Sequence, residues 1–312
     1  MVIFDALVRE QGISAAARRL GVSKSHISKQ LALLETALGA QLVQRTTRRF
    51  GLTELGQEYA RHCRALVAVA LEADSMVAER RGKVSGVLHL GVGQSFGRLH
   101  VIPRLKAFQA RYPDLELEVS LFVDHRTNLV DEGLDLWITT YEDKPESLVG
   151  QRLADIGFVL VASPDYLLSH GTPLHPRDLA HHNCITYQSR ERRYHEWSFR
   201  QGKERQTVQV AGNYRVDLAE AVRDAALAGL GIAYVANYLL DKELQSGQLI
   251  PLLPQWQPNQ KMAVHAVYAR REHLDPKIRL FIDFLKESFG PGPYWAQRLA
   301  PWLGGKLSGT EE

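Results

Sequence analysis

Residues 93–97 have residue types and a spacing that suggest covalent chemistry. Gly93-Gln94-Ser95-Phe96-Gly97 fits the G-x-S-x-G pattern of a serine hydrolase, in which a sharp turn after a strand exposes a nucleophilic serine. The apolar run 87–92 precedes it, as a strand should. Two interpretations follow. Ser95 attacks a substrate, or it lines a loop that binds a ligand without changing it.

A hydrolase needs more than this pattern. Several strands and an oxyanion loop should come before the serine, whereas residues 1–85 indicate helices. Free N–H groups at the start of the helix that follows the strand favour a carboxylate or another anion, and the Ser95 hydroxyl adds a donor. We therefore favour a ligand-binding role for Ser95 over a purely structural loop, with a serine hydrolase as the alternative function.

Metal and cofactor chemistry find no support in the sequence. His181, His182 and Cys184 offer metal-ligand types, but adjacent histidines do not converge easily on one ion, and no second cluster lies at a metal-site spacing. A turn that leads into a strand explains this stretch better. The sequence predicts no metal, no cofactor and no enzyme activity.

Composition indicates a globular protein of two or three units. The 312 residues are 45% hydrophobic and 23% charged, and the longest apolar run, 225–235, is too short to span a bilayer. The N-terminus does not resemble a signal peptide, which disfavours a secreted solute-binding protein. Two cysteines in different contexts favour a reducing cytoplasm over a disulfide framework.

Positive charge is concentrated at the start of the chain. Residues 1–85 hold 13 Lys and Arg against 8 Asp and Glu, a net of +5, while the remainder has a net of −2. Such a distribution suits a polyanion at this end of the chain, although a solvated basic surface would look the same.

Two short helices separated by a glycine occupy residues 14–35. Ser14 can cap the first, Gly21 breaks it, and Ser23 can cap the second. In the second helix Ile27, Leu31 and Leu34 share one face. The opposite face is small, polar or cationic, as in a helix that enters the major groove. Its residues are Lys24, Ser25, Ser28, Lys29 and Ala32.

The next two segments predict a wing and a long helix. Residues 38–53 hold β-branched and aromatic residues around three arginines, with no acidic residue, which favours two short strands with a basic tip. Thr53 can cap a helix from Glu54 to about Arg80, with apolar residues at a 3.5-residue period. This seam, with His62 as a polar member, predicts a dimer: Leu55, Tyr59, His62, Leu66, Val69, Ala73 and Met76.

Beyond residue 85 the pattern alternates between strands and helices, which predicts parallel sheets covered by helices. Two α/β lobes joined by crossings near residues 161 and 266 would leave a cleft at the carboxyl ends of the strands. Expected strands are 87–92, 115–121, 134–139, 157–162, 229–235 and 263–268; expected helices are 99–112, 127–132, 218–227 and 276–288.

These motifs resemble those of LysR-type transcriptional regulators. The DNA-binding signature matches at Ala16-Ala17, Leu20, Ser23, Ser28, Leu34-Glu35, Leu38-Gly39, Leu42-Val43, Arg45, Leu52-Thr53 and Gly56. Val43 replaces the usual phenylalanine. Later phrases resemble the family's effector domain: Pro103, Leu105, Phe108, Tyr112-Pro113, residues 133–136, residues 162–167 and residues 228–232.

The resemblance implies an α/β protein with an N-terminal winged helix-turn-helix and a two-lobed effector domain of the type-2 periplasmic-binding-protein fold. The implied domains are 1–53 for DNA binding, 54–85 as a dimerisation helix, 86–290 for effector binding and 291–312 as a tail. Lobe I would comprise 86–161 and 267–290, and lobe II 162–266. In the tail, Trp295 and Trp302 are candidates for packing on the body.

Candidate site residues follow from the resemblance and the expected strand ends. The candidates for DNA contact are Lys24, Ser25, Ser28, Lys29, Arg45, Arg48 and Arg49; those for effector contact are Gln94, Ser95, Phe96, Thr139, Thr140, Tyr187, Tyr214 and Arg215. The expected partners are promoter DNA, a small organic anion, RNA polymerase for an activator, and further copies of the chain in a dimer or tetramer. The operator, the effector and the direction of control stay open.

Overall fold

A computed structural model describes residues 1–44, 50–80, 84–123, 129, 132–141, 144–190, 192–260, 262–270 and 274–302, without the side chains of 65, 68, 69 and 71–80. The chain divides into two compact units, formed mainly by residues 1–86 and 87–312. Among the described residues, no helix is both long and apolar enough to cross a membrane.

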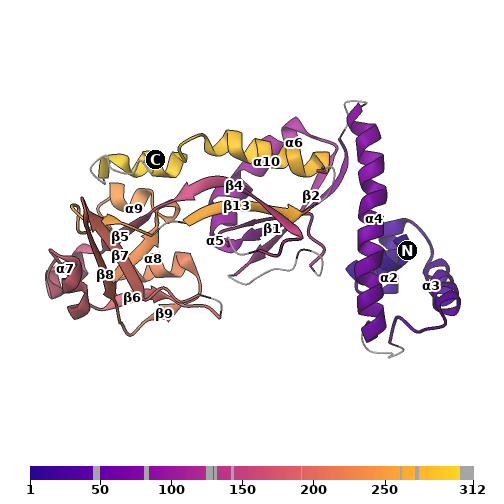
Figure 1. Ribbon diagram of the computed structural model, residues 1–312, viewed down its shortest axis with the longest axis horizontal. Coiled ribbons are helices and arrows are strands. Elements are labelled where there is room, and N and C mark those ends of the chain that lie inside the picture. The colour runs from indigo at the N-terminus through magenta and orange to yellow at the C-terminus, as the bar shows by residue number, and fades with distance from the viewer. Residues whose placement is uncertain are drawn as a thin grey trace. The chain divides into compact units, whose positions relative to one another are not determined.

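The first unit consists of helices, as the sequence predicts (Figure 1). Gly21 ends the second of them in the left-handed region at φ 64°, and the Ser23 hydroxyl accepts the His26 N–H at 3.1 Å to start the third. The cap predicted at Ser14 is wrong, because the second helix begins two residues earlier, with Gly12 at its N-cap. The helices are α1 (Val2–Arg9), α2 (Ile13–Leu20), α3 (Lys24–Leu38) and α4 (Glu54–Arg80).

Small residues allow these helices to pack closely. Ala16 and Ala17 of α2 are buried beside Ile27 of α3, which is fully buried. A second cluster joins Phe4 of α1 to Ala60 of α4. Burial of these residues fixes α3 with one face inside the unit and the opposite face outside.

The segment predicted as the wing begins at a short β-bridge, which Glu35 and Gly56 of the DNA-binding signature stabilise. Val43 pairs with Leu52 as an isolated antiparallel bridge, and the Glu35 carboxylate accepts the N–H groups of Leu42 and Val43 at 2.8 and 3.1 Å. Gly56 is required here, because a Cβ at this position would lie 2.0 Å from the Leu42 carbonyl oxygen. The arginines of the predicted tip, Arg45, Arg48 and Arg49, lie outside the described residues.

The second unit has two lobes, each built on a five-stranded mixed sheet. Lobe I has the strand order β2-β1-β3-β13-β4, and lobe II has the order β11-β5-β10-β6-β9. The strands of lobe I are β1 (Gly86–Gly93), β2 (Leu115–Phe122), β3 (Leu136–Thr139), β4 (Leu148–Ile156) and β13 (Met262–Ala269); those of lobe II are β5 (Phe158–Ala162), β6 (Cys184–Tyr187), β9 (Arg215–Val216), β10 (Ile232–Ala236) and β11 (Ile250–Pro251).

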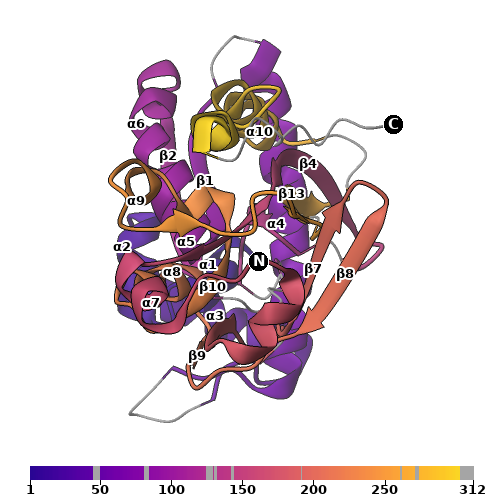
Figure 2. The ribbon, with the colours of Figure 1, turned by 90° about the vertical axis from the view of Figure 1, so that its left-hand side faces the viewer.

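Helices cover the sheets. In lobe I the Phe108 ring of α6 packs 4.9 Å from that of Phe281 in α10, and both helices lie over one face of the sheet (Figures 1 and 2). Lobe II carries a hairpin, β7–β8, that β12 extends to a third sheet (Figure 2). The remaining elements are α5 (Gln94–Phe96), a π-helix (Gly97–Val101), α6 (Ile102–Arg111), α7 (Pro164–His170), β7 (Glu196–Gln201), β8 (Glu204–Gln209), α8 (Ala219–Leu227), α9 (Lys242–Gln245), β12 (Gln257–Pro258), α10 (Pro276–Phe289) and α11 (Tyr294–Leu299), with 3-10 turns at Pro176–His181, Asn237–Leu239 and Ala300–Trp302.

The structure differs from the sequence-based topology in three respects. The sheets are mixed rather than parallel. In lobe I, β13 runs antiparallel to β3 and to β4, a strand that the sequence did not predict; in lobe II, β5 runs antiparallel to β10. The first crossing is at Gly157, and the second lies between β12 and β13, earlier than the expected residues 161 and 266. The helix after β1 begins at Gln94 rather than Leu99; the predicted helix 127–132 lies outside the described residues except for Leu129 and Glu132.

Candidate DNA-binding surface and ligand cleft

The polar face predicted on α3 is exposed. Lys24, Ser25, Ser28 and Lys29 are all accessible to solvent, while Ile27 on the other side of the helix is buried. The Ser23 and Ser25 hydroxyls lie 2.9 Å apart at the start of the helix. The α3 face therefore presents two cations and two hydroxyls, which can donate to phosphates or to base edges.

Helix α4 has two different faces. Gly56, Ala60 and Cys63 are buried inside the first unit, while Leu55 and Leu66 of the predicted seam are 49% and 52% exposed. His62 of the seam is also exposed.

Tyr59 is the half-buried member of the seam, with its ring 5.7 Å from that of Phe4. It therefore packs partly within its own unit. The side chains of Val69, Ala73 and Met76 lie outside the described ones.

A cleft opens between the lobes of the second unit, with a cavity volume of about 140 Å³. Six of the eight predicted effector residues line it: Gln94, Ser95, Phe96, Thr139, Thr140 and Tyr187. Tyr214 and Arg215 do not, so their predicted place in the cleft is wrong. Tyr214 precedes β9 and Arg215 is its first residue. This strand pairs with β6 at the edge of the sheet, and Arg215 is exposed.

Arg192 lines the cleft as well, and sequence reasoning missed it. Its guanidinium lies 3.5 Å from the centre of the Tyr141 ring and donates to the Thr140 hydroxyl at 3.0 Å and the Tyr194 hydroxyl at 3.3 Å. Since Tyr194 and Arg192 belong to lobe II and Thr140 and Tyr141 to lobe I, Arg192 joins the lobes at the cleft. It follows no sequence motif, and only the folded chain brings it to the cleft.

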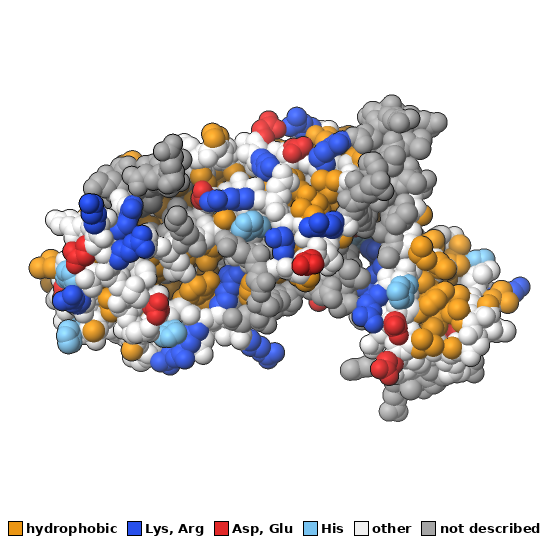
Figure 3. Space-filling view, in the orientation of Figure 1, with side chains coloured by type: hydrophobic (Ala, Val, Ile, Leu, Met, Phe, Trp, Pro, Cys, Tyr) orange, Lys and Arg blue, Asp and Glu red, His pale blue; other side chains and the backbone are white. Residues whose placement is uncertain are grey.

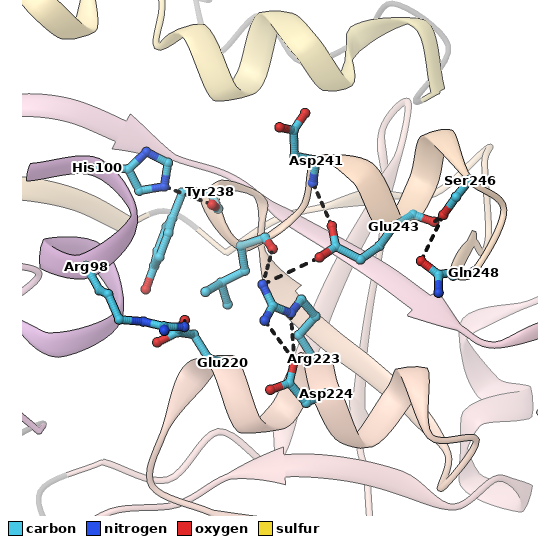
Figure 4. Close-up of polar contacts among 11 residues, drawn as sticks. Arg98, His100, Glu220, Arg223, Asp224, Tyr238, Asp241, Glu243, Ser246 and Gln248 are labelled. Carbon is cyan, nitrogen blue, oxygen red and sulfur yellow. Dashed lines mark hydrogen bonds and ion pairs between the residues drawn. The ribbon is translucent and has the colours of Figure 1, made fainter. Parts of the chain in front are cut away.

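A second contact between the lobes uses a buried carboxylate. Glu220 on α8 is 4% exposed and pairs with Arg98, which extends from the π-helix of lobe I (Figure 4). The guanidinium of Arg98 satisfies a charge that would otherwise be costly to bury. Nearby, Arg223 bonds the Leu239 carbonyl oxygen and Asp224 within lobe II (Figure 4).

The His100 ring lies beside the Phe96 ring, and both of its nitrogens have hydrogen-bond partners. The Nε2 atom lies 2.9 Å from the Tyr238 carbonyl oxygen, and Nδ1 contacts the Tyr294 hydroxyl. Burial lowers the pKa of His100 to about 4, so the ring is neutral at pH 7. Nε2–H then donates to the carbonyl, and Nδ1 accepts from the tyrosine.

The hydrolase interpretation of Ser95 therefore lacks a histidine that could act as its general base. Both nitrogens of His100 are engaged, and among the described residues that line the cleft there is no histidine. Ser95 itself is buried at 6% exposure on the wall of the cleft. A serine without a base within reach is a weak nucleophile.

His100 also predicts a pH dependence of stability. Its pKa is about 4 in the folded chain and near 6.5 when unfolded, so the unfolded chain binds more protons between these values. The contribution of His100 to the free energy of unfolding is present in full above pH 6.5. It is lost as the pH falls toward 4, and the total loss is about 3 kcal/mol. Urea unfolding at pH 7 and pH 5 should show this, with a smaller difference in His100→Gln; an equal difference in both proteins would contradict it.

The histidine and cysteine stretch of lobe II has structural contacts. Cys184 is buried in β6, and burial raises the pKa of its thiol to about 12. The His182 ring is 3.2 Å from the Tyr166 hydroxyl. Within the described part of the chain, no group of three or more His, Cys, Asp or Glu side chains is placed to hold a metal ion.

A helix-turn-helix unit followed by a two-lobed domain with a cleft defines a DNA-binding protein with a ligand sensor. Residues 1–57 match the family described as bacterial regulatory helix-turn-helix protein, lysR family, and residues 81–290 match the LysR substrate binding domain. The chain belongs to the LysR family of transcriptional regulators.

Known relatives agree with this family. A transcriptional repressor of Pseudomonas aeruginosa is 33% identical over 94% of this chain and 92% of its own length. The transcriptional activator TtdR of Escherichia coli is 28% identical over 89% of both chains. Among solved structures, the LysR-type regulator CrgA of Neisseria meningitidis has a TM-score of 0.60 at 28% identity, with 92% of this chain and 97% of that chain covered.

Proposed function

We propose that this LysR-type regulator binds promoter DNA as a dimer or tetramer through paired α3 helices and wings. The observation that carries the proposal is the exposed α3 face, with Lys24 and Lys29 beside Ser25 and Ser28. Arg45, Arg48 and Arg49 would follow the phosphates or enter a narrow minor groove. Such a protein acts in the cytoplasm, where bacterial DNA lies.

The exposed part of α4 supports a pairing of two chains. Leu55 and Leu66 are uncovered in a single chain, and a long apolar seam needs a partner helix. Hydrophobic side chains also gather on the visible face of the first unit (Figure 3). In this unit Met1, Val2 and Leu33 are each more than half exposed. A second copy of the chain would cover such surface and set two α3 helices on successive half-sites.

We further propose that a small organic anion binds in the cleft beside Gln94, Ser95 and Thr139. The ligand would favour one arrangement of the two lobes. It would shift the equilibrium between two assembly states by as much as its binding free energies for the two states differ. In an activator the second arrangement would present a surface to RNA polymerase. The relatives include a repressor and an activator, so both directions of control are compatible with the family.

Leu66→Glu tests the paired arrangement. A carboxylate in the seam should raise the dissociation constant of the dimer at least 10-fold, because two buried charges would face an apolar partner. Sedimentation equilibrium measures the dimer, and a gel shift with a duplex selected from a random library measures DNA binding. Both should weaken together.

Gln57→Glu is the matched control, since Gln57 is exposed on the same helix away from the seam. It adds the same charge to α4 and should leave the dimer intact. A Leu66→Glu protein that remains as dimeric as this control would refute the seam.

An esterase assay on Ser95→Ala tests the hydrolase alternative, which requires activity in the wild type that the variant loses.

A further inference from the structure

The walls of the cleft are unusually aromatic. Ten of its 29 lining residues are Phe, Tyr or Trp, against 8% of the whole chain. Both lobes contribute, with Phe96 and Trp137 from lobe I and Tyr187 and Tyr194 from lobe II. Ligand sites place flat apolar surface where the ligand has flat apolar surface, so this enrichment carries information on the ligand.

The rings form ordered stacks on the two sides. In lobe II, Tyr234 lies 5.1 Å from Phe158 and 5.4 Å from Trp197, with interplanar angles of 10° and 19°. In lobe I, the Trp137 and Tyr141 rings stack at 5.9 Å. Near-parallel rings on both walls suit a planar guest, since aromatic rings prefer offset-stacked or edge-to-face neighbours.

Polar groups lie together on the lobe I side of the cleft. Gln94 and Ser95 follow the end of β1, and Thr139 ends β3, the strand beside it. The Thr139 Oγ1 atom accepts the Tyr141 N–H at 3.1 Å, which leaves its hydroxyl proton to donate elsewhere. Hydroxyl and amide groups can both donate and accept, so they suit an oxygen-bearing substituent.

We propose that the ligand of this cleft is a compact molecule with one aromatic ring and one oxygen-bearing substituent, such as an aromatic carboxylic acid or amide. The ring lies among the aromatic walls, and Gln94, Ser95 and Thr139 bind the substituent. The cavity of about 140 Å³ is close in volume to an engineered apolar cavity of about 150 Å³ that binds benzene, which suits a single ring. This inference rests on the proposed function, because it takes the cleft as the effector site.

Matched ligand pairs test the ring requirement on the full-length protein. Isothermal titration should compare benzoate with cyclohexanecarboxylate and benzamide with cyclohexanecarboxamide. Each aromatic member should bind about 10-fold more tightly than its saturated counterpart, because only the aromatic ring gains stacking on both walls. Equal affinities within both pairs, or no binding of either aromatic member up to millimolar concentration, would overturn the proposed ligand class.

Tyr187→Leu tests whether the preference for aromatic ligands arises in the cleft. The half-buried Tyr187 ring lies 5.6 Å from that of Tyr194. The change should reduce the preference for aromatic ligands severalfold, and Tyr187→Phe, which keeps the ring, should retain it. Tyr214→Leu is the control, since Tyr214 is also half-buried in lobe II but lies outside the cleft. An equal loss in the control would overturn the location.

A gel shift separates this inference from the proposed function. Saturated acids that bind the cleft as tightly as their aromatic counterparts and alter DNA binding would refute the aromatic class and leave the proposed function intact. Aromatic ligands that bind with the expected preference but leave DNA binding unchanged would support the ligand class and refute the effector role.

Discussion

Replacing Trp295 with alanine should lower the free energy of unfolding of the second unit by about 3–5 kcal/mol, the usual cost of removing a buried tryptophan from a packed core. The side chain is 2% exposed. Its ring lies 5.6 Å from Phe96, 4.8 Å from His100 and 5.3 Å from Phe289. Alanine would leave a cavity among three rings that belong to lobe I.

The neighbours of Trp295 show why this cavity cannot close easily. Arg104 lies 4.4 Å from the centre of the Tyr294 ring, whose hydroxyl contacts His100. At the other end of α11, Arg298 pairs with Asp241 of lobe II at 3.3 Å. Both ends of the short helix are therefore held, and the surrounding side chains have little freedom to collapse into the space.

Trp302→Ala is the matched control for Trp295→Ala. Trp302 is 45% exposed in the same tail, and its loss should change stability by less than about 0.5 kcal/mol. All five tryptophans lie in the second unit, so tryptophan fluorescence during urea unfolding follows this unit alone. Equal midpoints for the two variants would show that the tail does not pack on the lobes in solution.

These two tryptophans illustrate what the sequence could not decide. The pattern after residue 290 marked both as candidates for packing, but their burial depends on lobe surfaces that are distant in sequence. The same limit explains Arg192, which belongs to no motif and reaches Thr140 only across the lobes. Side chains whose position depends on tertiary contacts leave no local signal.

The sequence predicted the features that depend on neighbouring residues, such as helix ends and helix faces. Gly21 and Ser23 stop one helix and start the next, and the α3 face follows from helical periodicity. The loop after β1 carried Gln94, Ser95 and Phe96 to the cleft because strand ends of one sheet share an edge. Arg215 was chosen for its charge alone, and it lies at the start of β9, a strand at the edge of its sheet.

Lys29→Glu should weaken DNA binding about 10-fold for each copy of the chain, or about 100-fold in a dimer, because it removes a cation near the phosphates and adds a repulsive charge. Lys29 is exposed on the α3 face and distant from the seam of α4 in sequence, so the dimer should persist. A gel shift with a library-selected duplex at two salt concentrations measures the affinity, and sedimentation confirms the dimer.

The control for Lys29 must change charge by the same amount away from DNA. Lys203 is exposed next to Gly202 at the turn of the β7–β8 hairpin, so Lys203→Glu gives the same net charge in the second unit. Its affinity for DNA should match that of the wild type. If Lys29→Glu bound the duplex as tightly as Lys203→Glu, the α3 face would not be the surface that meets DNA, because a reversed charge within a Debye length of the phosphates must lower affinity.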